Sequence, residues 1–167
     1  MSGTDADARN GAVGRGSDPD GHRPTAVALF NRTWELLGKT DRTADETDEL
    51  IGAAHASRYH WSKAGTLINL ARGDWQISRV YAALKRGEPA RWHAARCLDL
   101  VEAATAVGLA EDWDRAAAYE AMARAALAAG DREAAGEWRD RGMEALDAID
   151  DADDREQIER DLAGLSI

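Results

Sequence analysis

A short pattern of aromatic residues occurs twice in this chain, and it limits the possible folds more than any other feature. An Asp-Trp pair is followed, after five further residues, by Tyr: first at Asp74-Trp75 and Tyr81, then 38 residues later at Asp112-Trp113 and Tyr119. The match is informative because the whole chain holds only six Trp and three Tyr. Units that recur with a period of about 20–50 residues are typical of stacked supersecondary repeats. The pattern therefore predicts an array of similar units, with its two copies on equivalent helices, rather than a single enzyme core.

Apolar residues recur at helical spacing along most of the chain, in segments separated by glycine. Thr43 and Glu46 have the spacing of a capping box, which predicts the start of a helix. The predicted helices cover about residues 24–38, 44–64, 66–86, 89–108, 111–129 and 132–149, and a seventh carries Ile158, Leu162 and Leu165. The second helix is rich in small residues such as Gly52, so we expect a neighbouring helix to approach it closely. Because short connections make neighbours antiparallel, the predicted fold is all-α, with stacked helical hairpins.

Composition divides the chain into two parts. Residues 1–23 are rich in Gly, Asp, Ser and Arg and contain almost no large apolar side chains, so burial cannot offset the entropy cost of ordering them. We expect a disordered N-terminal tail there. Residues 24–167 are long enough for one helical domain. The last predicted helix is charged on its outer face, as a C-terminal capping helix requires.

The charge balance limits the partners of this chain. Its formal net charge is −10, from 31 acidic and 21 basic residues, which argues against nucleic acid and anionic membranes as partners. No apolar run approaches the roughly 20 residues of a transmembrane helix. The N-terminus lacks the apolar core of a signal peptide, and a single Cys97 cannot form an intrachain disulfide. We therefore expect a cytoplasmic protein, with Cys97 buried as a small apolar residue.

Two segments resemble tetratricopeptide repeats. The residues that carry the resemblance are Ser78, Tyr81, Leu84, Gly87-Glu88 and Ala90 in one unit, and Ala123, Gly130-Asp131 and Ala135 in the next. The segments His55 to Trp61 and Asn69 to Tyr81 are similar to those of a bacterial group of short tetratricopeptide-like proteins. The turn-based alignment spaces the units 45 residues apart, longer than the usual period of that family, and differs from the 38-residue register of the aromatic pattern. The resemblance implies a short right-handed array, and it brings no catalytic residues.

In the tetratricopeptide arrangement, the first helices of successive hairpins line a concave groove, here the first, third and fifth predicted helices. Arg72, Trp75 and Arg79 lie on one stripe of the third helix, at i, i+3 and i+7. The candidate binding residues are these three, with Trp113, Glu120 and Arg124 on the fifth helix and Arg58 and Trp61 on the second. Guanidinium groups bind carboxylates and indole rings supply apolar contact area. The predicted partner is therefore a peptide or protein segment that is acidic or ends in its C-terminal carboxylate.

Other interpretations of the same residues remain open. In one, the Trp residues wedge between hairpins and the Arg residues pair with local carboxylates. In another, exposed Trp92 or Trp138 mediates self-association into a homo-oligomer. A third, weaker hypothesis is a helical hydrolase or ribonuclease that acts through His60 or His93. The first of these histidines lies five residues after His55, whereas zinc hydrolases place two His at i, i+4, and no phosphate-binding loop or nucleophile elbow occurs. We therefore expect no enzymatic activity, no metal and no cofactor.

Overall fold

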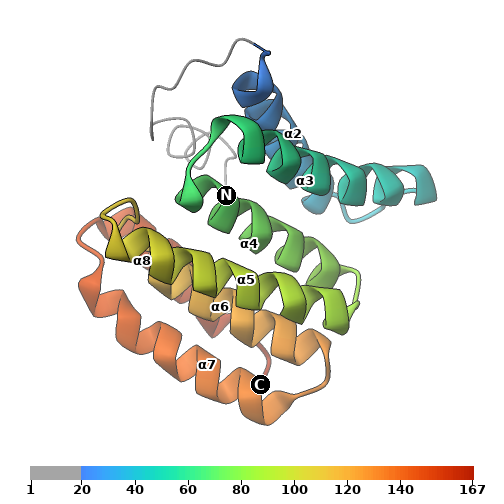
Figure 1. Ribbon diagram of the computed structural model, residues 1–167. Helices are drawn as coiled ribbons and strands as arrows, with labels where there is room; N and C mark the ends of the chain where they lie inside the picture. Colours follow the sequence, from blue (N-terminus) through green and yellow to red (C-terminus); the bar gives the residue numbers. More distant parts are fainter. Residues whose placement is uncertain (1–19) are drawn as a thin grey trace.

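The structure is a computed structural model that describes residues 20–167. Its elements in chain order are α2 (His22–Leu37), α3 (Ala44–Ala64), α4 (Leu67–Ala83), α5 (Gly87–Ala106), α6 (Asp114–Ala128), α7 (Arg132–Ala145), the 3₁₀ turn η1 (Leu146–Ala148) and α8 (Ala152–Ala163). Every regular element in this part of the chain is helical (Figure 1). This confirms the predicted all-α class. Most of the predicted disordered tail, residues 1–19, lies outside the described residues.

Three consecutive hairpins, α2–α3, α4–α5 and α6–α7, stack in chain order, and α8 closes the array (Figure 1). The first helices of the hairpins also contact one another: α4 lies against α2 and α6, and α6 lies against α8. The second helices α3 and α5 pack on α4 from two sides. The arrangement confirms the predicted stack of antiparallel hairpins and places α2, α4, α6 and α8 in one layer.

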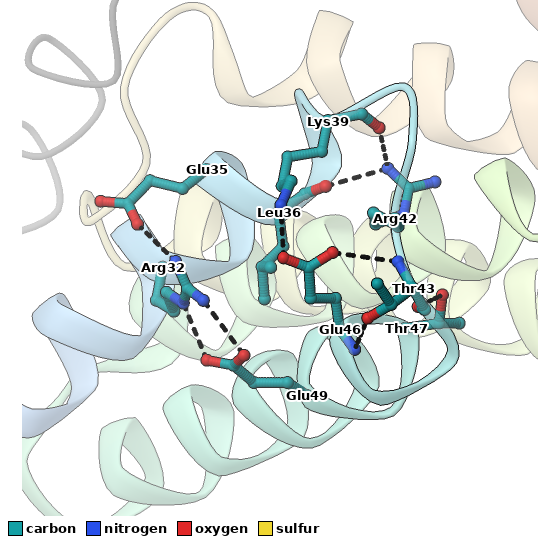
Figure 2. A network of polar contacts seen from close by, with 9 residues as sticks. All are labelled: Arg32, Glu35, Leu36, Lys39, Arg42, Thr43, Glu46, Thr47 and Glu49. Atoms are coloured by element: carbon teal, nitrogen blue, oxygen red, sulfur yellow. Dashed lines mark hydrogen bonds and ion pairs between the residues drawn. The ribbon is translucent and has the colours of Figure 1, made fainter.

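The α2–α3 hairpin shows how local polar contacts set the ends of the helices (Figure 2). Thr43 Oγ1 accepts a hydrogen bond from the Glu46 amide at 3.2 Å, and Glu46 Oε2 accepts one from the Thr43 amide at 3.0 Å. This is the predicted capping box, and it satisfies amides that have no partner within the helix. Arg42 closes the other side of the turn by donating to the carbonyl groups of Leu36 and Lys39.

Two helices begin earlier than expected. Helix α2 starts at His22, so two residues assigned to the N-terminal tail are helical, and α5 starts at Gly87 rather than at Pro89. In each case proline occupies the third helical position, where its missing N–H costs nothing because first-turn amides have no partner within the helix. At the other end of the domain, the helix expected to reach residue 149 ends as an α-helix at Ala145 and continues as the η1 turn.

The two copies of the aromatic pattern belong to equivalent first helices, α4 and α6, as expected, but they do not lie at equivalent positions. Trp75 lies in the middle of α4, whereas Trp113 is the N-cap residue that precedes α6. The hairpins instead follow the turn-based register: α5 begins at Gly87 and α7 at Arg132, 45 residues later. The positions of the connecting turns, rather than the aromatic residues, define the repeating unit.

Small residues bring some of the helices close together. A side chain added at Gly87 would place its Cβ 2.4 Å from the Ala129 Cα, and one added at Gly142 would lie 2.8 Å from Leu162. Gly52 was expected to serve such an approach, but it is exposed and has no neighbour within 4 Å of a Cβ placed there. Cys97 is buried, as predicted, and burial raises the pKa of its thiol. Among the described helices, none is both long and apolar enough to span a membrane.

Candidate functional site

A cleft of about 1270 Å³ opens along the layer of first helices. Its walls come from α2, α4 and α6, the three helices expected to form a groove, and also from α8. The capping helix was not expected to contribute to the groove. The residues that line the cleft include Trp34, Glu35, Lys39, Arg79, Ala83, Arg124, Arg160 and Asp161.

Arg79 spans the cleft from α4 to α8. Its Nη1 and Nη2 donate to the two carboxylate oxygens of Asp161 at 3.0 and 3.2 Å. Its guanidinium also lies 5.4 Å from the ring centroid of Trp34 on α2, a cation–π contact. Burial alone would lower the pKa of Arg79, but Glu120 and Asp161 raise it above its ordinary value. One side chain therefore links three walls of the cleft and stays charged.

A buried carboxylate on α6 holds a second guanidinium beside the first. Glu120 is 2% exposed; its Oε1 accepts from Arg124 Nε at 2.6 Å, and its Oε2 lies 3.9 Å from Arg79 Nη1. Arg124 follows Arg79 by 45 residues, which is the spacing of the hairpins. The two arginines therefore occupy equivalent positions in successive units, and one acidic side chain beneath them keeps both in place.

The cleft is more basic than the chain as a whole. Its charged lining residues are Lys39, Arg79, Arg124 and Arg160 on the positive side, and Glu35 and Asp161 on the negative side. The chain itself has a formal net charge of −10. At the rim, Lys39 pairs with Glu46 and Glu35 pairs with Arg32, as Figure 2 shows. The cations that line the cleft thus outnumber its lining carboxylates, and their further acidic partners are Glu46, Glu120 and Glu156.

Arg72 does not share the cleft with Arg79, so that part of the prediction is wrong. It is 4% exposed, and its Nε and Nη2 each donate to a carboxylate oxygen of Asp114 at 3.0 Å. The Trp113 ring lies over its guanidinium, 4.5 Å from centroid to Cζ. Seven residues separate the two arginines on α4, or about 10 Å along the helix. At the Arg72 end the start of α6 covers the stripe, so Arg72 and Trp113 pack between hairpins.

Three further predicted binding residues also lie away from the cleft. Trp75 is partly buried and packs 5.4 Å from Trp34, ring to ring. Trp61 is fully buried, and Arg58 Nε lies 2.8 Å from an oxygen of buried Asp74. Of the eight candidates, only Arg79 and Arg124 line the cleft, with Glu120 directly beneath them.

The residues of the self-association and enzyme hypotheses lie outside the cleft. His60 lies at a 2.8 Å nitrogen–nitrogen distance from His22 of α2, and buried His93 binds Asp74 through Nδ1 at 2.7 Å. Trp138 stacks on Tyr119, with 5.8 Å between ring centroids, while Trp92 is 52% exposed. None of these four residues lines the cleft. No group of three or more potential metal ligands occurs within residues 20–167.

Sequence reasoning missed two residues that shape the cleft. Asp161 pairs with Arg79 across 82 positions, and the Trp34 ring centroid lies 5.4 Å from the guanidinium of Arg79. The only available signal for Asp161 was its place beside the apolar residues Ile158 and Leu162, which predicted a buried face but not a partner. Comparisons with models of protein families, with curated proteins and with solved structures find no match to this chain. The resemblance to tetratricopeptide repeats therefore stays a prediction from the sequence.

Proposed function

We propose that this protein is a non-enzymatic helical-repeat scaffold, similar to tetratricopeptide proteins, that binds a segment of a partner peptide or protein in the cleft. The observation that carries the proposal is the pair Arg79 and Arg124, at equivalent positions in successive hairpins, both on the cleft wall and both held by Glu120. Repeat proteins characteristically bind extended segments on the surface that their repeated helices share.

The chemistry of the lining favours a segment that carries carboxylates. Arg124 uses Nε and Nη2 on Glu120, which leaves Nη1 to donate to a ligand. Charge-assisted hydrogen bonds from a guanidinium are among the stronger polar contacts in proteins. Trp34 and Ala83 offer apolar surface in the same cleft for the rest of the segment. An acidic segment or a C-terminal carboxylate is therefore the partner chemistry that fits.

The lining also favours binding over catalysis. The residues around the cleft include no histidine or cysteine, the side chains that most often move protons or attack substrates near neutral pH. Of the two carboxylates that line the cleft, Glu35 pairs with Arg32 at the rim, and Asp161 has a pKa that burial would raise but that Arg79 lowers below its ordinary value. It stays ionised and paired, which suits a structural link better than a general acid.

Photo-crosslinking in the cell tests the proposal. A photoreactive amino acid replaces Ala83, an exposed residue of the cleft, or Ala95, an exposed residue of α5 outside it. We expect a covalent adduct with another polypeptide from position 83 only. Arg124→Gln should reduce the adduct about tenfold, since one charge-assisted hydrogen bond contributes about 1.5–3 kcal/mol.

Arg139→Gln is the matched control, because this arginine lies on α7 with its side chain 36% exposed and pairs only with its neighbour Asp140. It should leave the adduct unchanged. Equal adducts from positions 83 and 95, or an adduct that is indifferent to Arg124→Gln, would contradict a partner site in the cleft. An adduct made of two copies of this chain would instead support self-association, which sedimentation analysis would then show as a dimer.

A further inference from the structure

A second concentration of polar side chains lies outside the cleft, where α3 and α5 flank α4 (Figure 1). We call it the α3–α5 cluster. Its members are His55 and Arg58 of α3, Asp74 and Tyr81 of α4, and His93 and Arg96 of α5. None of them lines the cleft between the first helices. The binding function proposed above therefore leaves this cluster unused.

Asp74 is the centre of the cluster, and positive charge outweighs it. Its side chain is fully buried; Oδ1 lies 2.7 Å from His93 Nδ1, while Oδ2 lies 2.8 Å from Arg58 Nε and 3.7 Å from Arg96 Nε. The Arg58 contact is an ion pair without hydrogen-bond geometry, because both of its atoms lack a hydrogen-bond partner. Two guanidinium groups thus share one carboxylate oxygen, and the cluster carries an excess positive charge on an acidic chain.

Two histidines meet beside these arginines. The His55 and His93 rings are 5.4 Å apart between centroids, and His55 Nε2 lies 3.0 Å from the Tyr81 hydroxyl. Burial and the neighbouring His93 lower the pKa of His55. The His93 ring is only 7% exposed, and its Nδ1 lies within hydrogen-bond distance of Asp74. The imidazole and phenol groups therefore add polar atoms next to the guanidinium groups of Arg58 and Arg96.

Exposed aromatic rings border the same place. The large hydrophobic side chains exposed within residues 20–167 are Tyr59, Trp92, Val107 and Met143. The two aromatic ones adjoin the cluster: Tyr59 lies one turn along α3 from His55, at i+4, and Trp92 precedes His93 on α5 and stacks on Arg96 at 4.5 Å. Exposed aromatic side chains beside fixed cations form a surface with both apolar and anion-binding character.

We propose that the α3–α5 cluster binds a small ligand that joins a phosphate group to a planar aromatic ring, as a nucleotide does. Guanidinium forks match the oxygens of a phosphate. Trp92 and Tyr59 supply faces on which a base can stack. The site takes a mononucleotide rather than a nucleic-acid polymer, because the strongly acidic chain repels a long polyanion.

Titration by nuclear magnetic resonance tests this assignment on the full chain, with the ring signals of His55 and His93 as the readout. The probes are adenosine monophosphate, inorganic phosphate and adenosine. We expect adenosine monophosphate to shift both rings and to bind about tenfold more tightly than either fragment, since the phosphate and the base each contribute at least one strong contact. Inorganic phosphate should shift the same signals at higher concentration.

Two substitutions separate the contributions of the charge and the ring. Arg96→Gln, whose side chain is 38% exposed, should weaken binding of adenosine monophosphate and of phosphate about tenfold each. Trp92→Ala should weaken only the nucleotide. The matched control is Arg91→Gln, on the same helix with its side chain 52% exposed, which should change neither affinity. Circular dichroism melting checks that each variant is folded.

Three outcomes would overturn the proposal. If adenosine monophosphate at millimolar concentration shifts neither histidine ring signal, the ligand does not bind at the cluster. Equal affinity for adenosine and adenosine monophosphate removes the phosphate contact, and equal affinity for phosphate and adenosine monophosphate, with no effect of Trp92→Ala, removes the aromatic contact. None of these results bears on the cleft, since the two sites share no residue.

Discussion

At the residue scale, ion pairs occupy positions that apolar side chains hold in many helical proteins. Arg72 and Asp114 are 4% and 2% exposed, and two hydrogen bonds of 3.0 Å join them. Asp114 also accepts a hydrogen bond from the Glu111 amide at 2.8 Å, at the start of α6. A buried pair is tolerated when its remaining hydrogen-bonding groups are satisfied, and this pair meets that condition. It links two hairpins by a contact with strict geometry.

Removing one partner of this pair should be costly. Arg72→Met leaves the Asp114 carboxylate buried without its counterion, so we expect unfolding in urea to show a loss of about 3–5 kcal/mol in stability. The double variant with Asp114→Leu should recover part of this loss, because it no longer buries an unpaired charge. As a control, Glu156→Gln breaks the exposed Arg160–Glu156 pair, whose side chains are 62% and 70% exposed, and should change stability little. A loss below 1 kcal/mol for Arg72→Met would mean that the Asp114 carboxylate finds solvent when unpaired.

At the scale of helices, the position of a glycine decides what it does. Gly87, at the start of α5, lies against the backbone of Ala129 at the end of α6. Gly52, in the middle of α3, faces open space. The sequence placed Gly87 between two predicted helices and Gly52 within one, and it did not show which of the two has a close neighbour. Whether a glycine permits a close approach depends on which helix lies beside it, and that is a property of the packed array.

The two glycines should therefore respond to alanine in opposite directions. Gly87→Ala places a methyl group within 2.4 Å of the Ala129 Cα, so α5 must shift, and we expect a loss of about 1–3 kcal/mol. Gly52→Ala meets no neighbour and should stabilise the protein by up to about 1 kcal/mol, because alanine favours the helix. Thermal melting of both variants measures the difference. Destabilisation by both substitutions would mean that α3 has a close neighbour at Gly52 in solution.

At the scale of the whole molecule, α8 acts as more than a cap. Its apolar residues Ile158 and Leu162 pack on α6 and η1, and Asp161 on the same helix pairs with Arg79 of α4 across 82 positions. The pair completes the fourth wall of the cleft. Closure of the site therefore depends on a contact between α8 and a helix of the second hairpin, α4.

This contact should make the free energy of unfolding depend on pH in the acidic range. Burial alone would raise the pKa of Asp161, but hydrogen bonding to Arg79 lowers it below its ordinary value. A carboxyl group with a lowered folded-state pKa stabilises the protein above its unfolded pKa of about 3.9, and that contribution disappears as the pH falls through the folded-state pKa. Asp161→Asn should therefore be less stable than the parent at pH 7, and the difference should shrink below about pH 4. Urea denaturation at pH 7 and pH 3 measures it. An equal difference at both pH values would show that the ion pair does not carry the effect.

Local signals in the sequence were sufficient for the helices and for the class of fold. The Thr43–Glu46 capping box predicts the start of α3 correctly, because capping and helical periodicity act within a few residues. Helix starts were off by two residues at Pro24 and Pro89, since a proline can occupy any position of the first turn. The chain alone therefore determined an all-α stack of hairpins and the presence of Arg79 and Arg124 on its first helices.

Which of these side chains share a surface depends on contacts between helices far apart in the chain. Arg72 and Arg79 lie on one stripe of α4, yet the first is sealed by Asp114 and the second opens on the cleft. Their partners, Asp114 and Asp161, are 42 and 82 positions away in the chain. The α3–α5 cluster likewise combines residues of three helices. Such contacts depend on the axial shift and the rotation of each helix relative to its neighbours. In this molecule, the close packing of small residues sets both. The sequence specifies each helix locally, whereas the sites exist only where separate helices meet.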